Sequence, residues 1–318
     1  MSGAVMRAVS QDRFGGPEAL HVVQRPVPEP LPTEVRVRVR AAGLNPVDLA
    51  TRAGGGMADV LGAPPFVLGW DVAGVVDAVA PGVTRFAVGD RVFGFPRFPH
   101  EAGAYAEYLT APARHFAATP AVLDDDRAGA LPVAGLTAWH VLVDTARLEA
   151  GQRVLIHGAG GGVGHLAVQI AKACGAEVIG TASATKHNAL AALGIDDVLD
   201  YQRERFETAV CDADLVVDLV GGDVPFRSLE VLRPGGLLVH VVSDVLPAGL
   251  AAAAAARGVR ATAILAEPDH ATLEQLADLA TAGALQVLLH DRFPLAAAAD
   301  AHDLAERTHP LGKVVLTS

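Results

Sequence analysis

The chain has 318 residues, of which 51% are hydrophobic and 19% are charged, and its formal net charge is −11 at pH 7. This length predicts two domains with sizeable apolar cores, and the negative charge argues against nucleic acid as a partner, because phosphate binding needs clustered Lys and Arg. The only cysteines are Cys174 and Cys211, which excludes a disulfide framework and a zinc site built from cysteines. Since we find neither a leader-type segment nor an apolar run of membrane-spanning length, we expect a cytoplasmic protein without a membrane partner.

The first part of the chain, up to residue 118, has the pattern of a β-rich domain. Residues 34–40 alternate apolar and charged side chains with a period of two, as a half-buried strand does. Residues 74–79 and 90–94 are further short strands, separated by turns rich in Gly and Pro, and together they indicate a compact barrel or sandwich. Short strand-like pieces return near the C-terminal end, so we assign residues 1–118 and 290–318 to one domain.

The central part, residues 119–289, has a different pattern. Apolar strands alternate with helical segments, which predicts right-handed βαβ units in a parallel sheet. The predicted fold class is therefore α/β, with a Rossmann-type, doubly wound parallel sheet inserted into the β-rich domain. We place its strands at residues 153–157, 177–181, 197–199, 215–220 and 236–242.

A glycine-rich turn is the most informative motif of the chain. An apolar strand ends at residue 157, the run Gly-Ala-Gly-Gly-Gly-Val-Gly follows at 158–164, and an amphipathic helix begins. This context is the one that a dinucleotide fingerprint requires, with the pyrophosphate at the helix N-terminus. An ordinary tight turn is the alternative. A nucleoside-triphosphate loop is excluded, since Gly164 is followed by His165 and Leu166 rather than by Lys and Ser or Thr.

The segment after the second strand decides between NAD and NADP. A carboxylate there would hold the ribose 2′-hydroxyl of NAD and repel the 2′-phosphate of NADP. Residues 179–187 contain no acid, and the next one is Asp196. Thr181, Ser183 and Lys186 are suited to bind a phosphate through charge-assisted hydrogen bonds, which favours NADPH. A solvated loop with a surface lysine is the alternative.

Several motifs occur in the same order as in one known family. The chain resembles the zinc-independent quinone oxidoreductase (zeta-crystallin-like) branch of the medium-chain dehydrogenase/reductase superfamily, over nearly its whole length. The resemblance implies a GroES-like fold for the β-rich catalytic domain. It is carried by the glycine turn and by residues 6–9, 14–18, 42–48, 69–76, 89–92, 103–108 and 131–139.

The same resemblance bears on metal and reaction. Zinc-dependent relatives have a cysteine at the place of Asn45 and a histidine at the place of Trp70, and the 12 histidines form no recognisable ligand motif. We therefore expect no metal site. Without a Lewis acid, the favoured reaction is hydride transfer from NADPH to an electrophilic acceptor, a quinone or an α,β-unsaturated carbonyl compound.

The resemblance also implies roles for single residues. Asn45 is expected to hydrogen-bond the acceptor oxygen, and Thr137 to contact the nicotinamide or the substrate. The alternative for Asn45 is to stabilise the turn before Pro46, and the alternative for Thr137 is to cap a helix. Asp48 and Asp71 have no acid–base partner nearby in sequence, so neither is predicted to be catalytic.

The remaining predicted site residues concern the cofactor. The glycine turn should hold the pyrophosphate, Ser183, Lys186 and Tyr201 the adenosine phosphate, and the residues after the fourth and fifth strands the ribose and nicotinamide. Lys313 is expected to reach the cofactor, with an exposed surface lysine as the alternative. The full set is Ala159, Gly160, Gly161, Gly162, Val163, Gly164, Thr181, Ser183, Lys186, Tyr201, Val220, Gly221, Val241, Val242, Ser243 and Lys313.

Two other functions and an oligomeric state stay open. The chain is alternatively an enoyl-thioester reductase, or a cofactor-binding regulatory protein without physiological turnover. Residues 237–245 form an apolar strand that we place at the edge of the Rossmann sheet. Because an exposed apolar edge needs covering, we expect a homodimer.

Overall fold

The computed structural model describes residues 4–318, and the chain divides into two compact units. Unit 1 comprises the residues up to Leu136 together with Glu267–Ala282 and Val287–Ser318, and unit 2 comprises Thr137–Ala266 and Gly283–Gln286. Unit 1 thus extends beyond residue 118 and also includes the helix α10 (His270–Thr281). The reason is packing, since Leu276 of this helix lies so close to Gly135 that a methyl group there would be 2.7 Å from Leu276 Cδ1.

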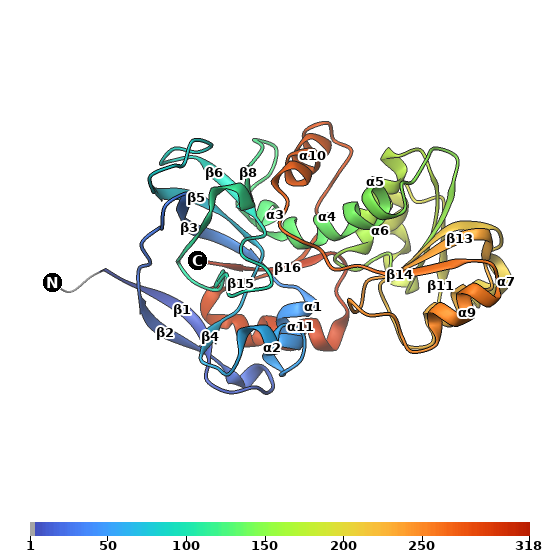
Figure 1. The fold of residues 1–318 in the computed structure, drawn as a ribbon, viewed down its shortest axis with the longest axis horizontal. Helices are drawn as coiled ribbons and strands as arrows, with labels where there is room; N and C mark the ends of the chain where they lie inside the picture. Colours follow the sequence, from blue (N-terminus) through green and yellow to red (C-terminus); the bar gives the residue numbers. More distant parts are fainter. Residues whose placement is uncertain (1–3) are drawn as a thin grey trace. The chain divides into compact units, whose positions relative to one another are not determined.

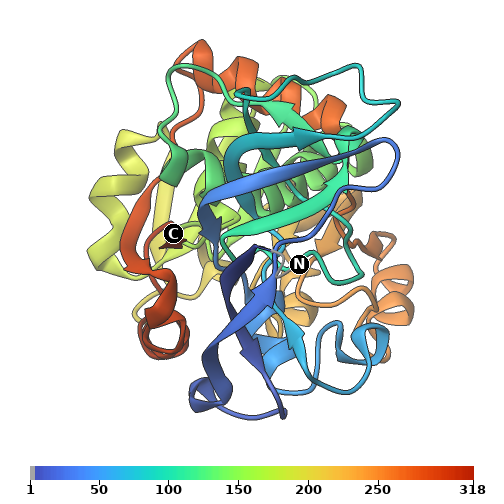
Figure 2. The same cartoon turned by 90° about the vertical axis from the view of Figure 1, so that its left-hand side faces the viewer.

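Among residues 4–318, unit 1 contains two sheets (Figure 1). The larger sheet has seven strands, in the order β15-β16-β3-β5-β6-β8 with β7 also paired to β3, and the smaller has the order β2-β1-β4. In Figure 2, β1 and β2 form the dark blue two-stranded ribbon. The strands are β1 (Val5–Gln11), β2 (Leu20–Pro26), β3 (Glu34–Gly43), β4 (Phe66–Val67), β5 (Val72–Val79), β6 (Arg91–Gly94), β7 (Tyr108–Pro112), β8 (Phe116–Ala118), β15 (Leu289–Pro294) and β16 (Lys313–Thr317).

Strand β3 confirms the predicted alternation. Val35, Val37 and Val39 are at most 2% exposed, while Arg38 and Arg40 face solvent. The period of two therefore places one face of this strand in the core.

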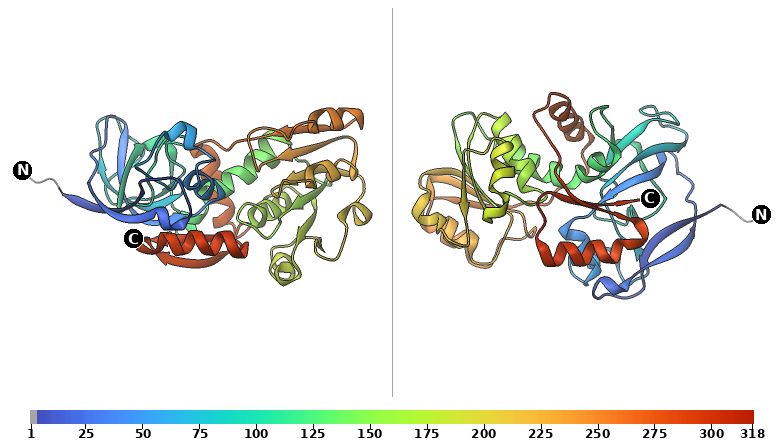
Figure 3. Two further views of the ribbon diagram at one scale, coloured as in Figure 1. Left: turned by 90° about the horizontal axis from the view of Figure 1, so that it is seen from below. Right: turned by 180° about the vertical axis from the view of Figure 1, so that it is seen from behind.

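The helices of unit 1 lie mostly beside these sheets. α11 lies beside α1 (Figures 1 and 3). Arg52, at the end of α1, bonds His302 and Glu306 of α11. The helices are α1 (Pro46–Arg52), α2 (Ala58–Leu61), α3 (Asp125–Ala130), α10, α11 (Ala298–Thr308) and the short 3-10 turns η1 (Pro17–Ala19), η2 (Ala113–His115) and η5 (Leu295–Ala297). Helix α4 (Pro132–Trp139) contains the boundary between the units.

Unit 2 has the predicted Rossmann-type sheet, and the predicted fold class is confirmed. Its six strands are all parallel and follow the order β11-β10-β9-β12-β13-β14, which is the doubly wound arrangement. They are β9 (Arg153–His157), β10 (Glu177–Ala182), β11 (Asp197–Asp200), β12 (Ala213–Asp218), β13 (Leu232–His240) and β14 (Arg260–Ala263).

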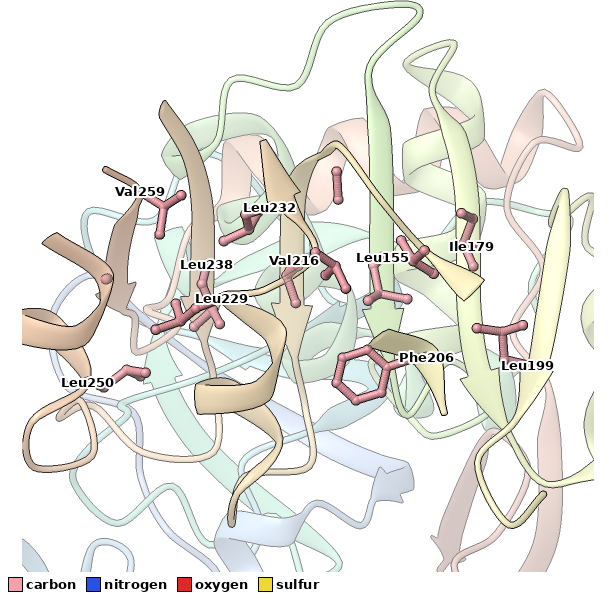
Figure 4. Packing of buried hydrophobic residues seen from close by; sticks show 14 residues of the cluster. Leu155, Ile179, Leu199, Phe206, Val216, Leu229, Leu232, Leu238, Leu250 and Val259 are labelled. Carbon is pink, nitrogen blue, oxygen red and sulfur yellow. The ribbon is translucent and has the colours of Figure 1, made fainter. Parts of the chain in front are cut away.

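Helices cover both faces of this sheet (Figure 1), α5 and α6 on one side and α7 and α9 on the other. On the second side Phe206 and Leu250 pack against strand residues such as Leu155, Val216 and Leu238 (Figure 4), which explains the near-continuous apolar runs of these strands. The helices are α5 (Gly164–Ala173), α6 (His187–Ala192), α7 (Phe206–Ala209), α8 (Val224–Ser228), α9 (Leu250–Ala256), a π-helical turn η3 (His140–Thr145) and the 3-10 turn η4 (Ala184–Lys186).

One prediction about this sheet is wrong. We placed residues 237–245 at its edge, but β13 ends at His240 and pairs on both sides, with β12 and with β14. The edge strand is β14, so the argument for a dimer through residues 237–245 loses its basis. Separately, within residues 4–318 none of the helices combines the length and the apolar character needed to cross a bilayer.

Candidate active site

The glycine turn of unit 2 joins β9 directly to α5. Gly158 has a φ of 71°, a conformation that favours glycine, and the amide of Gly161 donates to the carbonyl of Gly158 at 2.9 Å. Gly164 allows the closest approach, since a methyl group there would lie 2.2 Å from the Gly158 carbonyl oxygen. The glycines therefore fold the chain so that a helix begins immediately at the end of a parallel strand.

This turn leaves backbone donors open. Within the described residues, the amides of Gly162, Val163 and Gly164 donate no hydrogen bond, and they sit at the positive end of the α5 dipole. Residues 161–163 are partly exposed. Adjacent, open and uncluttered N–H groups at a helix N-terminus fit a pyrophosphate.

Thr181 supports the turn from inside. It is 5% exposed, and its hydroxyl lies 3.1 Å from Nδ1 of His157 and 3.4 Å from the amide of Gly158. Ala159 donates to the Thr181 carbonyl at 3.1 Å. The structure thus gives Thr181 bonds to the turn itself, a role that the sequence did not suggest.

The residues predicted for the adenosine phosphate follow the ends of β10 and β11. The side chain of Lys186 lies against the turn, since a methyl group on Gly160 would be 2.5 Å from Lys186 Cδ. Ser183 Oγ is 3.2 Å from Thr185 Oγ1, and the pairing of Ala182 with Asp200 places Tyr201, which is 58% exposed, at the same edge of the sheet. Partial burial lowers the pKa of Lys186 from its usual value.

The nearest acid in sequence lies elsewhere. Asp196 precedes β11, where it bonds Lys172 at 2.7 Å and the amide of Val178 at the start of β10. It is therefore at the opposite end of the strand from Ser183 and is unable to bind a ribose there. The choice of NADPH over NADH stays a prediction.

The ends of β12 and β13 form the rest of this edge. The carboxylate of Asp218 accepts from the amides of Val220 at 3.0 Å and Gly221 at 2.9 Å, and its other oxygen lies 2.7 Å from His240 Nδ1. These two amides are thus already bonded, so only their side chain and carbonyl atoms are available to a cofactor. Val220 and Val242 are each 54% exposed, and Val241 and Ser243 flank Val242 on the same segment.

Asn45 of unit 1 is the N-cap of α1 and is almost fully buried, at 2% exposed. Its backbone amide donates to Asp48 Oδ2 at 2.9 Å, which fixes the first turn of the helix. Its side-chain nitrogen donates to Asp71 Oδ2 at 2.8 Å, and its oxygen accepts from Lys313 Nζ. The predicted alternative, a stabilised turn before Pro46, is present in the structure; contact with an acceptor oxygen stays a prediction.

The alternative role of Lys313, an exposed surface lysine, is wrong, because the residue is only 3% exposed. Its ammonium donates to the Leu44 carbonyl at 2.9 Å, to Asp71 Oδ2 at 3.1 Å and to Asn45. An ammonium has three N–H donors, and all three are used within unit 1. We therefore remove Lys313 from the set of cofactor-binding residues.

Asp48 and Asp71, for which the sequence predicted no catalytic role, belong to the polar network around Asn45. Both are fully buried, and burial raises their pKa, to about 7 for Asp48. Asp71 also accepts from the amide of Val133 at 2.6 Å. A methyl group on Gly43 would lie 2.6 Å from Asp71 Oδ2, so Gly43 leaves room for this carboxylate. The glycine in the motif 42–48 was the sequence signal that could have pointed to Asp71.

A chain of buried side chains leads away from Asp48. The guanidinium of Arg52 only donates, so His302 Nδ1, at 3.1 Å, accepts and the ring proton sits on Nε2, 3.1 Å from the Tyr105 hydroxyl. Burial raises the pKa of Tyr105, and the nearby carboxylate of Asp48 raises it further. Burial lowers the pKa of His302 to about 3, which keeps the ring neutral, with Nδ1 as the acceptor and Nε2 as the donor.

Thr137 lies inside α4 and is 6% exposed. Its alternative as a helix-capping residue is therefore wrong, because the helix begins five residues earlier at Pro132. Contact with the nicotinamide or the substrate stays a prediction.

Comparison with known proteins adds to this geometry. Residues 31–121 match the model of the alcohol dehydrogenase GroES-like domain, and residues 193–316 match a model named zinc-binding dehydrogenase. The chain is 36% identical to a quinone oxidoreductase of Pseudomonas aeruginosa over 95% of its own length and 97% of that protein. It is 33% identical to a 2-haloacrylate reductase of a Burkholderia species, over 98% of both.

A third relative is much longer than this chain. The identity is 42% to the spectinabilin polyketide synthase system protein NorB of Streptomyces orinoci, over 71% of this chain but 10% of that protein. The chain therefore spans only a tenth of that relative.

Solved structures agree with the sequence relatives. The quinone oxidoreductase from Coxiella burnetii has a TM-score of 0.93 at 35% identity, over 99% of this chain and 100% of that one. The Escherichia coli quinone oxidoreductase complexed with NADPH has a TM-score of 0.87 at 28% identity, over 98% and 100%. The CurK enoyl reductase has a TM-score of 0.89 at 26% identity, over 98% and 99%.

The fold, the glycine turn and the relatives together show the family of this chain. The chain is an oxidoreductase with a nicotinamide-cofactor-binding fold, and it belongs to the zinc-independent quinone oxidoreductase branch of the medium-chain dehydrogenase/reductase superfamily.

Proposed function

We propose that the chain reduces a quinone or an α,β-unsaturated carbonyl compound with NADPH and without a metal ion. The observation that carries the cofactor assignment is the carboxyl edge of β10, where Lys186 lies against the open glycine turn and residues 179–187 contain no carboxylate. The neighbour complexed with NADPH and the quinone oxidoreductase relatives support the proposal.

The residues of unit 2 would hold the cofactor as follows. The amides of Gly162, Val163 and Gly164 would bind the pyrophosphate, and Lys186 with Ser183 would bind the 2′-phosphate. Val220, Gly221 and the segment 241–243 would line the ribose and nicotinamide side through apolar and carbonyl atoms. When bound, NADPH supplies the hydride that the acceptor receives.

In unit 1, Asn45 would contribute one N–H to the acceptor oxygen. Such a donor stabilises negative charge as it develops on that oxygen. Thr137 of unit 2 would contact the nicotinamide or the substrate. The proton that completes the reduction would come from solvent, since all three tyrosines are accounted for elsewhere: Tyr105 bonds His302, Tyr108 packs under Arg36 and Tyr201 follows β11.

The residues at the metal positions of zinc-dependent relatives do not fit a metal ion. The oxygen of Asn45 and one oxygen of Asp71 already bind the ammonium of Lys313, and a divalent cation beside that charge would be repelled. Trp70 donates its indole N–H to the His100 carbonyl at 2.8 Å. Among residues 4–318, no group of three or more His, Cys, Asp or Glu side chains is arranged to hold a metal.

The loss of NADPH absorbance with a panel of acceptors tests the proposal. We expect turnover with benzoquinone, phenanthrenequinone or a simple enone, and the same rate after treatment with a chelator. A chelator-sensitive rate, or a preference for NADH, would contradict the proposal.

An enoyl-thioester reductase is the second candidate, favoured by the likeness to the CurK enoyl reductase. Selective turnover of crotonyl-CoA in the same assay would establish it. NADPH binding without turnover of any acceptor would instead indicate a regulatory cofactor-binding protein. A homodimer remains an expectation, and light scattering measures it.

A further inference from the structure

Lysine and asparagine are both rare in this chain, and one residue of each kind, Lys313 and Asn45, are bonded to each other. Its 25 basic Lys and Arg residues include only three lysines, Lys172, Lys186 and Lys313, and its only asparagines are Asn45 and Asn188. Burying an ammonium is costly unless the charge is paired and every N–H has an acceptor. Lys313 meets both conditions, through Asp71, Asn45 and the carbonyl of Leu44.

These partners determine which way the carboxamide of Asn45 is turned. An ammonium only donates and a carboxylate only accepts. The amide oxygen must therefore face Lys313, and the amide nitrogen must face Asp71, at 2.8 Å. A rotated amide would set N–H against N–H and oxygen against oxygen. Of the two N–H groups of Asn45, one is bonded to Asp71 and one is left over.

We infer that Lys313 is a positioning residue, which together with Asp71 fixes the carboxamide of Asn45 so that it offers an N–H donor and no acceptor to a substrate oxygen. This rests on the proposed function, in which the acceptor oxygen gains negative charge. Lys313 acts through Asn45, because its own three donors are used. Beside Asn45 a substrate carbonyl oxygen, which accepts a hydrogen bond, is therefore favoured over a hydroxyl group, whose proton would find no acceptor there.

A double variant separates positioning from simple stability. Lys313→Met alone leaves the carboxylate of Asp71 buried without its cation, and Asp71→Asn alone leaves the ammonium without its anion, so both single variants are expected to lose stability. The double variant Lys313→Met/Asp71→Asn removes both charges, and buried ion pairs are often replaced by neutral groups without net loss. Its Tm should return toward that of the wild type, but nothing then fixes the amide.

Nuclear magnetic resonance reads the amide directly. Asparagine labelled with nitrogen-15 gives only two side-chain amide pairs in this chain, and Asn188, which is exposed, is an internal control. We expect the Asn45 protons to exchange slowly in the wild type. In the double variant their resonances should move and their exchange should speed up about tenfold, the effect of one lost hydrogen bond. Unchanged Asn45 resonances in the double variant would overturn the inference.

Kinetics supply the second readout. In the double variant, kcat with benzoquinone should fall about 100-fold, as for loss of a fixed oxyanion donor, while the Kd for NADPH stays unchanged. Lys172→Met, which removes a lysine paired with Asp196 in unit 2, should keep both values. A double variant that recovers kcat together with Tm would show a merely structural lysine.

The two hypotheses fail in different ways. A wild-type protein that turns over neither quinone nor enone contradicts the proposed function, and the resonance experiment still decides whether Lys313 fixes Asn45. A wild-type protein that is active but whose double variant is equally active contradicts the inference alone.

Discussion

The glycine turn of unit 2 and the Asn45 network of unit 1 are built in opposite ways. The turn uses backbone atoms of one continuous segment, residues 158–164, and leaves several amides open. The network uses side chains from residues 45, 48, 71 and 313, whose polar atoms are bonded to one another and to backbone groups of unit 1. A site for a fixed anion can stay open because water solvates its amides, whereas buried charges have to be satisfied by the protein itself.

The largest effect is expected in the turn. Gly164→Ala would place a methyl group 2.2 Å from the Gly158 carbonyl, so we expect loss of NADPH binding by at least about 100-fold together with reduced stability. Gly161→Ala, whose methyl group would meet only the Gly158 carbonyl at 3.3 Å, should keep its Tm and lose affinity alone. Calorimetry and thermal denaturation measure the two effects. Equal loss of stability in both variants would show that the turn is not open for a ligand.

A variant in the buried series Arg52, His302 and Tyr105 should lose stability but keep its affinity for NADPH. Arg52→Met removes a guanidinium that is 3% exposed and binds His302 and Glu306, so we expect a loss of about 2–3 kcal/mol in the free energy of unfolding. The Kd for NADPH should not change. Arg7→Met, which breaks the exposed pair with Glu107, should cost less than about 1 kcal/mol. Urea titration compares the two, and similar losses would contradict the assignment of stability to the buried chain.

The cofactor preference is a smaller effect. Lys186→Met keeps the aliphatic contact with Gly160 but removes the charge, so the Kd for NADPH should rise about tenfold, which corresponds to one charge-assisted hydrogen bond. The Kd for NADH should change by less than about twofold, because NADH lacks the 2′-phosphate. Lys172→Met is the control. A parallel rise for both nucleotides would remove Lys186 from the phosphate site.

The last effect concerns pH. Burial lowers the pKa of His157 in unit 2 to about 4, against 6.5 for an ordinary histidine. Between these values the unfolded chain binds a proton that the folded chain does not. The stability is therefore complete above about pH 6.5 and is lost as the pH falls toward 4, by at most about 1.4 kcal/mol per pH unit.

The matching variant is His157→Gln, which still offers polar atoms to Thr181 and Ser228. Its stability should depend less steeply on pH over this range than that of the wild type. Guanidinium denaturation at several pH values gives both slopes, and identical slopes would show that His157 does not carry this proton.

Much of unit 2 could be predicted from the sequence because its signals are local. A strand, a glycine turn and a helix follow one another within residues 153–173, and the strands β9 to β11 lie within one or two residues of their expected bounds. The wrong edge strand has a physical cause. β14 reads Arg-Ala-Thr-Ala and is short and only partly buried, so it lacks the apolar run that marks the other strands.

The Asn45 network could not be predicted because its signal is distributed. Lys313 follows Asn45 by 268 residues, and a lone lysine near the end of a chain is usually exposed. Likewise, the spacing of Asp48 and Asp71 says nothing of their partners. Only the pairing of β16 with β3, where Val315 lies opposite Gly43, brings Lys313 to Leu44 and Asn45.

That pairing also sets an order of events during synthesis. β3 is made early, but its partner β16 emerges only after the whole of unit 2, Thr137–Ala266 and Gly283–Gln286, has been translated. At about 5–20 residues per second, β3 waits on the order of 10–60 s for it. Unit 2 is therefore free to fold co-translationally, whereas the polar site of unit 1 is completed only when residue 313 arrives.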